Sequence, residues 1–146
     1  MLMDIQNQFS NAQAITATAV STNYVDLGAI CNIGTGECLY LVLHITTAFT
    51  DASSDSTLTP SMEADNNTSF SSPATIRTFD VFAALTAVNT IRKYRLEPFT
   101  DSGLFERYLH LRYTVANGNF TTAAISSFLV EDVQAWKAYA VGYTIQ

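Results

Sequence analysis

The chain has 146 residues, of which 48% are hydrophobic and only 14% are charged, and its formal net charge is −6. This length suits one domain with a single core, and all seven Lys and Arg residues follow residue 76, a balance that argues against nucleic acid as a partner. No run approaches the roughly 20 apolar residues of a membrane-spanning helix, and the start of the chain lacks the basic and apolar stretches of a signal peptide.

The low charged content means that Ser, Thr and Asn cover much of the surface, since ordinary soluble domains carry roughly 25% charged residues. Such a surface loses less on desolvation than a Lys- and Glu-rich one. It therefore suits extensive contact with other protein, although Thr is also common in β-rich proteins for the sake of the strands themselves. Both explanations remain open.

The first segment, residues 1–11, is predicted to be an N-terminal arm. Ile5 and Phe9 are isolated apolar residues among Gln, Asn and Asp, with no strand alternation. An arm with isolated apolar anchors needs a surface on which to dock. Residues 12–20 and 24–30 then alternate apolar and polar side chains and predict two strands.

The strongest strand prediction covers residues 38–47, which read CLYLVLHITT. Alternation places Leu39, Leu41, Leu43 and Ile45 on one face, so this strand should be central. Residues 48–57 and 65–73 are rich in Ser, Thr, Asn and Asp and predict loops. Between them, residues 58–64 predict a strand, and Pro60 favours an edge position for it.

The second half of the chain predicts further strands over residues 75–85 and 91–99. The latter is basic and holds Arg92, Lys93 and Arg95. Residues 106–132 then hold two alternating segments joined at Asn117-Gly118, a pair that suits the two positive-φ positions of a type I′ turn. This last stretch predicts a long antiparallel hairpin.

These elements predict an all-β fold: a jelly-roll-like antiparallel β-sandwich of about eight strands over residues 12–130. Residues 131–146 follow as a C-terminal tail with three aromatic side chains, Trp136, Tyr139 and Tyr143. Trp and Tyr are frequent interface anchors, so the tail could dock on a partner. It could equally form one more strand or a short helix that closes its own core.

The inventory of chemically active groups is thin. The chain has two histidines, His44 and His110, and both fall in strands opposite the Leu-rich faces, where a histidine satisfied by the sheet or by solvent is expected rather than a general base. Cys31 and Cys38 match no standard zinc spacing and are expected to be free thiols. We therefore predict no catalytic residue, no cofactor site and no metal site, and we do not expect an enzyme.

Three stretches together resemble the small capsid cement (decoration) proteins of tailed bacteriophages: MDIQNQFSNAQAITATAVSTNYVDLG, RYLHLRYTVANGNFTTAAISSFLVEDVQ and AYAVGYTIQ. The resemblance implies a jelly-roll-like protein on the capsid exterior, assembled in the host cytoplasm, that clamps neighbouring copies of the major capsid protein. It also implies association with itself, as a homodimer in the first place or a trimer in the second. Neither nucleic acid nor a membrane is expected as a partner.

The expected contact residues are those that could reach another protein: Ile5, Phe9, Arg92, Arg95, Trp136, Tyr139 and Tyr143. The alternative function is a carbohydrate- or receptor-binding β-sandwich on a virion, with the loops at 50–57 and 65–72 as its reading surface. Only Phe70 supplies an aromatic side chain there, which counts against this alternative. A small enzyme on a β-sandwich ranks third.

Overall fold

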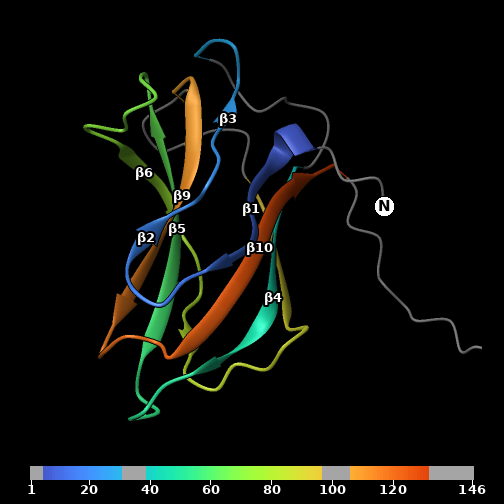
Figure 1. Cartoon of the computed structure of the whole chain (residues 1–146). Helices are drawn as coiled ribbons and strands as arrows, with labels where there is room; N and C mark the ends of the chain where they lie inside the picture. Colours follow the sequence, from blue (N-terminus) through green and yellow to red (C-terminus); the bar gives the residue numbers. More distant parts are fainter. Residues whose placement is uncertain (1–4, 31–38, 97–105, 132–146) are drawn as a thin grey trace, which may run out of the picture.

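The computed structural model describes residues 5–30, 39–96 and 106–131 (Figure 1). A single turn of 3₁₀ helix, η1 (Ile5–Asn7), precedes the strands. The strands are β1 (Gln8–Ala14), β2 (Ala19–Val20), β3 (Val25–Asp26), β4 (Tyr40–Thr50), β5 (Thr57–Asp65), β6 (Ala74–Thr78), β7 (Phe82–Ala83), β8 (Ile91–Arg95), β9 (Tyr108–Ala116) and β10 (Thr122–Val130). In this part of the chain, no helix has the length and apolar character to cross a membrane.

The strands form two antiparallel sheets that face each other (Figure 1). The first sheet has the order β1-β10-β4-β8. The second sheet has β9 and β5 paired at its centre. On its other side, β9 pairs with β2 and β3, and on its other side β5 pairs with β6 and β7. If β2 with β3, and β6 with β7, each count as one interrupted strand, the described part has eight strands. In chain order, the first of these pairs with the eighth, the second with the seventh, the third with the sixth and the fourth with the fifth. This is one long hairpin wound on itself, so the predicted jelly-roll-like sandwich is confirmed.

The core lies between the sheets and follows the alternation read from the sequence. Leu41, Leu43 and Ile45 of β4 are fully buried, as are Leu109 and Leu111 of β9. Side chains of the opposite parity therefore point to the outer faces of the sheets. The predicted central position of residues 38–47 is confirmed, because β4 pairs with β10 on one side and β8 on the other.

The sandwich begins earlier than predicted, because residues 8–11 belong to β1 rather than to an arm. Backbone pairing of Gln8 with Phe128 places this strand beside β10. Irregular register along β1 explains why the sequence shows no clean alternation there, since the ladder shifts twice within seven residues.

The hairpin predicted over residues 106–132 is wrong. Asn117 and Gly118 do have positive φ angles, 62° and 116°, but the turn carries the chain from one sheet to the other. β9 pairs with β2, β3 and β5, whereas β10 pairs with β1 and β4. A turn signal fixes the reversal of the chain but not which strands become neighbours.

The edge position predicted from Pro60 is also wrong, since β5 is paired on both sides. The strand next to Pro60 is interrupted there: β6 ends at Thr78 and β7 begins at Phe82. The Pro60 carbonyl accepts a hydrogen bond from the Phe79 amide, which lies in this interruption, at 2.9 Å. A central strand tolerates proline here because the ladder is already broken.

Candidate functional site

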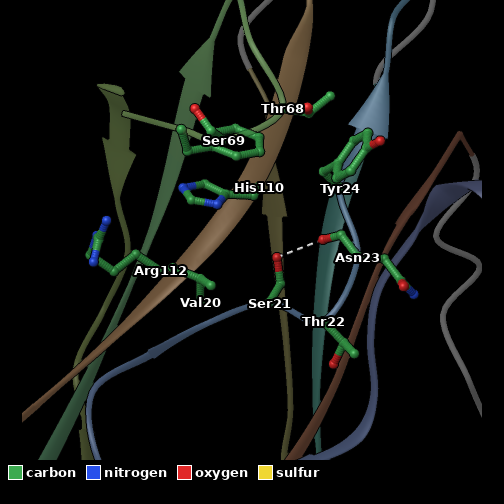
Figure 2. A pocket seen from close by; sticks show the side chains of 10 residues that line it. Val20, Ser21, Thr22, Asn23, Tyr24, Thr68, Ser69, His110 and Arg112 are labelled. Atoms are coloured by element: carbon green, nitrogen blue, oxygen red, sulfur yellow. Dashed lines mark hydrogen bonds between the residues drawn. The ribbon is translucent and has the colours of Figure 1, made fainter. Parts of the chain in front are cut away.

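Among the described residues, a hollow of about 250 Å³ lies on the outer face of the second sheet. Three separate segments line it: residues 20–24 around β2 and β3, Thr68 to Phe70 after β5, and His110 with Arg112 on β9. Figure 2 shows Tyr24 on one side of this space and His110 on the other, with Ser21 below them.

The floor of the pocket is set by an ion cluster across β5 and β9. Glu63 lies opposite His110 in the strand register, and its carboxylate accepts hydrogen bonds from His110 Nε2 at 2.7 Å and from Arg112 Nε at 2.7 Å. Glu63 is 5% exposed. Burial alone would raise the pKa of Glu63, but the hydrogen bonds from Arg112 and His110 outweigh it and lower the pKa.

One wall is held in place by an aspartate at the end of β5. Asp65 accepts hydrogen bonds from the Asn67 amide at 3.2 Å, the Asn67 side chain at 2.9 Å and the Ser72 amide at 3.1 Å. This folds the loop back over the sheet, so that Phe70 stacks on His110 with ring centroids 3.8 Å apart and an interplanar angle of 4°. Phe70 adopts a φ of 46°, a conformation that costs energy for a residue with a side chain and that often accompanies functional sites.

The opposite wall is Tyr24, whose side chain is 45% exposed. Its ring contacts Tyr108 edge-on, with centroids 5.5 Å apart, and lies 6.1 Å from Phe70. Ser21 fixes the preceding backbone: its hydroxyl accepts from the Leu111 amide at 3.0 Å and donates to the Asn23 carbonyl at 2.7 Å. The aromatic wall is therefore pre-positioned.

Several polar groups of the pocket have no hydrogen-bond partner among the described residues: the Tyr24 and Thr68 hydroxyls, His110 Nδ1 and the two Nη groups of Arg112. Within the same ranges, no group of three or more His, Cys, Asp or Glu could hold a metal ion. His110 is bonded to Glu63 rather than to a hydroxyl or thiol nucleophile.

A second notable surface is the stretch from Val81 to Ile91, which contains β7 and ends at the first residue of β8, and which we call the Leu85 segment (residues 81–91). Its large apolar side chains are exposed at Val81, Leu85, Val88 and Ile91. Hydrogen bonds tie it to β4: the Thr86 carbonyl accepts from Phe49, and Ile45 exchanges bonds with Thr90 and Asn89. Leu85 itself has a φ of 65° and is 64% exposed. The strand predicted over residues 75–85 ends within this stretch, and the sequence did not predict an exposed apolar surface there.

A model of the Bbp16 family matches residues 9–129. The chain belongs to the Bbp16 family. The match runs from Phe9 in β1 to Leu129 in β10, so it spans nearly the whole sandwich and includes both the pocket and the Leu85 segment. A comparison with curated proteins finds no match.

Two of the predicted contact residues lie near the start of the chain and differ sharply. Ile5 is 77% exposed in η1, as an interaction residue requires. Phe9 is fully buried in the core of β1. The expectation that Phe9 docks on a partner is therefore corrected, because its side chain is already packed within its own sandwich.

The two predicted arginines lie on β8, at the edge of the first sheet. The Arg92 guanidinium stacks over the Phe82 ring at 3.9 Å and donates to the carbonyls of Asp80 and Val81 at 3.0 and 2.9 Å. Arg92 thus fixes the backbone at the start of the Leu85 segment. Arg95 is exposed, and its carbonyl accepts from Arg77. The remaining predicted contacts, Trp136, Tyr139 and Tyr143, lie outside the described residues, as do Cys31 and Cys38.

Proposed function

We propose that this protein is a capsid cement protein, which binds the exterior of a phage shell and clamps adjacent subunits of the major capsid protein. The resemblance of its sequence to decoration proteins, given above, supports this role. So does the absence, within the described residues, of a nucleophile bonded to a histidine or of a metal-binding cluster. The sandwich is a scaffold that presents surfaces.

The observation that carries the proposal is the conformation of Leu85. A left-handed conformation costs about 1–2 kcal/mol for a residue with a Cβ atom, and a side chain that is 64% exposed recovers little of this by burial. Leu85 therefore contributes little to the stability of its own protomer. Contact with another protein would supply the missing burial.

The surroundings of Leu85 favour the same conclusion. The Leu85 segment is fixed by backbone bonds to β4 and by the Arg92 guanidinium, so its apolar side chains are held before a partner arrives. Pre-positioned groups lose less conformational freedom on association. The segment reaches β8, which lies at the edge of its sheet among the described strands, a position at which another chain can pair.

Cementing requires that the protein bind the assembled shell in preference to its precursor. A ligand that binds one state alone lowers the free energy of that state, and an expanded shell under pressure from packed DNA gains most from it. Many identical sites on one lattice, engaged by an oligomer, turn weak contacts into firm attachment. In addition to the Leu85 segment, Ile5, Arg95 and the aromatic residues of the tail remain predicted contacts.

The test is cosedimentation of the purified protein with mature capsids that lack it and with unexpanded procapsids, followed by heat-induced release of DNA. We expect saturable binding to mature capsids and delayed DNA release. Leu85→Asp should abolish binding, whereas the matched control Ile30→Asp, at a similarly exposed apolar position outside the segment, should bind like the wild type. Lack of binding to both shells would refute the cement role, and binding of Leu85→Asp at wild-type affinity would refute the assigned contact.

A further inference from the structure

We propose that the pocket between Tyr24 and His110 binds a single pyranose ring of a glycan. This activity is separate from attachment to a capsid. It rests on the walls, the polar groups and the volume of the pocket, and each of these narrows the class of ligand.

The charges of the pocket do not favour an ionic ligand. Arg112 is paired with Glu63, so the cluster offers no unbalanced positive charge for an anion. The lining contains no carboxylate for a cation. A neutral ligand is the one that the electrostatics of the pocket favours.

The polar groups exclude a purely apolar ligand, which would leave them desolvated and unpaired. The Arg112 Nη groups donate, His110 Nδ1 can accept, and the hydroxyls of Tyr24 and Thr68 can do both. Hydroxyl groups around a sugar ring also donate and accept. A polyhydroxylated ring therefore matches this mixed set better than a ligand with groups of one kind.

Tyr24, which lines the pocket and is 45% exposed, supplies the remaining requirement, an aromatic surface for the C–H groups of a ring. Tyr108 supports the Tyr24 ring edge-on, and Phe70 lies beside it. The hollow of about 250 Å³ falls below the range of roughly 300–1,000 Å³ typical of larger small-molecule sites. One ring fits these dimensions better than an extended chain.

The geometry also revises the carbohydrate alternative raised by the sequence. The loops at 50–57 and 65–72 lie at opposite ends of β5 (Figure 1), a strand that spans about 26 Å, so they cannot form one reading surface. The loops alone supply Phe70 as their only aromatic residue, and the structure adds a second one beside it, Tyr24, from another part of the chain.

The test begins with the full-length protein on an array of glycans with defined terminal pyranoses. Titration with the methyl pyranoside of the strongest ligand then follows the amide resonances by NMR. We expect saturable binding, with shifts confined to residues 20–24, 68–70 and 110–112. Failure of every array glycan and methyl pyranoside to bind, or shifts centred elsewhere, would overturn the proposal.

Variants assign the binding to the pocket. Tyr24→Ala should weaken binding about tenfold through loss of the platform, and Tyr24→Phe, which keeps the ring, should weaken it less. Thr68→Trp changes an exposed loop residue and should block the pocket without unfolding the sandwich. The control Leu85→Ala should bind glycan like the wild type. Wild-type affinity in Thr68→Trp or in Tyr24→Ala would place the ligand elsewhere and refute the site.

Discussion

The left-handed conformation of Leu85 can be tested by comparing Leu85→Ala with Leu85→Gly. Both variants remove the same side chain, which is 64% exposed, so each loses about 0.5–1 kcal/mol, a third of the 1.5–3 kcal/mol for full burial. Glycine alone also relieves the φ of 65°, worth about 1–2 kcal/mol, against about 0.5–1 kcal/mol of extra chain entropy. Leu85→Gly should therefore be more stable than Leu85→Ala by about 0.5–1 kcal/mol.

The assay is urea unfolding of all variants at one protein concentration, because self-association makes stability depend on concentration. Val88→Ala and Val88→Gly are the matched control, since Val88 is another exposed apolar residue of the same segment but lacks a positive φ. There the order should reverse, with alanine more stable than glycine by about 0.5–1 kcal/mol. If glycine is the less stable residue at both positions, Leu85 is not strained in solution, and the argument for its role as a contact fails.

Substitutions at three further positions test the site and the core. Glu63→Ala should cost about 3 kcal/mol in urea unfolding at pH 7, because it leaves His110 and Arg112 without their shared acceptor. Burial would raise the pKa of Glu63 but these two hydrogen bonds lower it below 4.5, so wild-type stability should fall as the pH drops below 4.5, and Glu63→Gln should flatten that fall. Tyr113 is fully buried, and its hydroxyl is hydrogen-bonded to the hydroxyls of Ser10 and Ser127. Tyr113→Phe should therefore cost about 1–2 kcal/mol, because it leaves these two groups without that partner. Burial, partly offset by hydrogen bonds, raises the pKa of Tyr113 to about 12, so wild-type stability should fall as the pH rises above 10, and a flat alkaline profile would contradict this. Asp65→Ala should accelerate amide hydrogen exchange in the loop after β5, measured by mass spectrometry, and unchanged exchange would show that Asp65 does not hold the loop.

The strands that the sequence predicts well are those with one face in the core. Leu41, Leu43 and Ile45 of β4 alternate with less apolar neighbours, and the period of two reveals both the strand and its buried face. The prediction is less accurate where the pattern is interrupted. Residues 75–85 appear as one strand because Phe79 and Phe82 are both apolar, yet the chain leaves the ladder between them and buries both rings.

The sequence predicts which strands pair with each other less well than it predicts the strands themselves. Asn117-Gly118 correctly indicates a reversal with two positive φ angles, and adjacency in sequence then suggests a hairpin. A sandwich allows the reversed chain to enter either sheet. The choice depends on which strands already flank β9 and β10, a property of the whole topology that no local pattern encodes.

The pocket could not be predicted from the sequence because its walls come from three distant segments. The sequence shows Phe70 as the only aromatic residue of a polar loop and His110 as a histidine opposite a Leu-rich face. No local sequence pattern predicts that these two side chains are in contact. Their stacking depends on Asp65, whose carboxylate bends the loop back. An acidic residue followed closely by Asn and Ser is a usable signal for such a turn, although it does not show what the loop covers.

The two proposed activities occupy different ends of the sandwich. Thr57, at the start of β5, pairs with Ala83 just before Leu85, whereas Asp65, at its end, holds the loop that forms the pocket. The intervening strand spans about 26 Å. A partner seated on the Leu85 segment therefore leaves the pocket open to solvent. Because the floor of the pocket is a strand pair in which Glu63 is bonded to both His110 and Arg112, we expect attachment at the far end to leave its geometry unchanged. A capsid-bound copy should consequently bind glycan with the same affinity as the free protein.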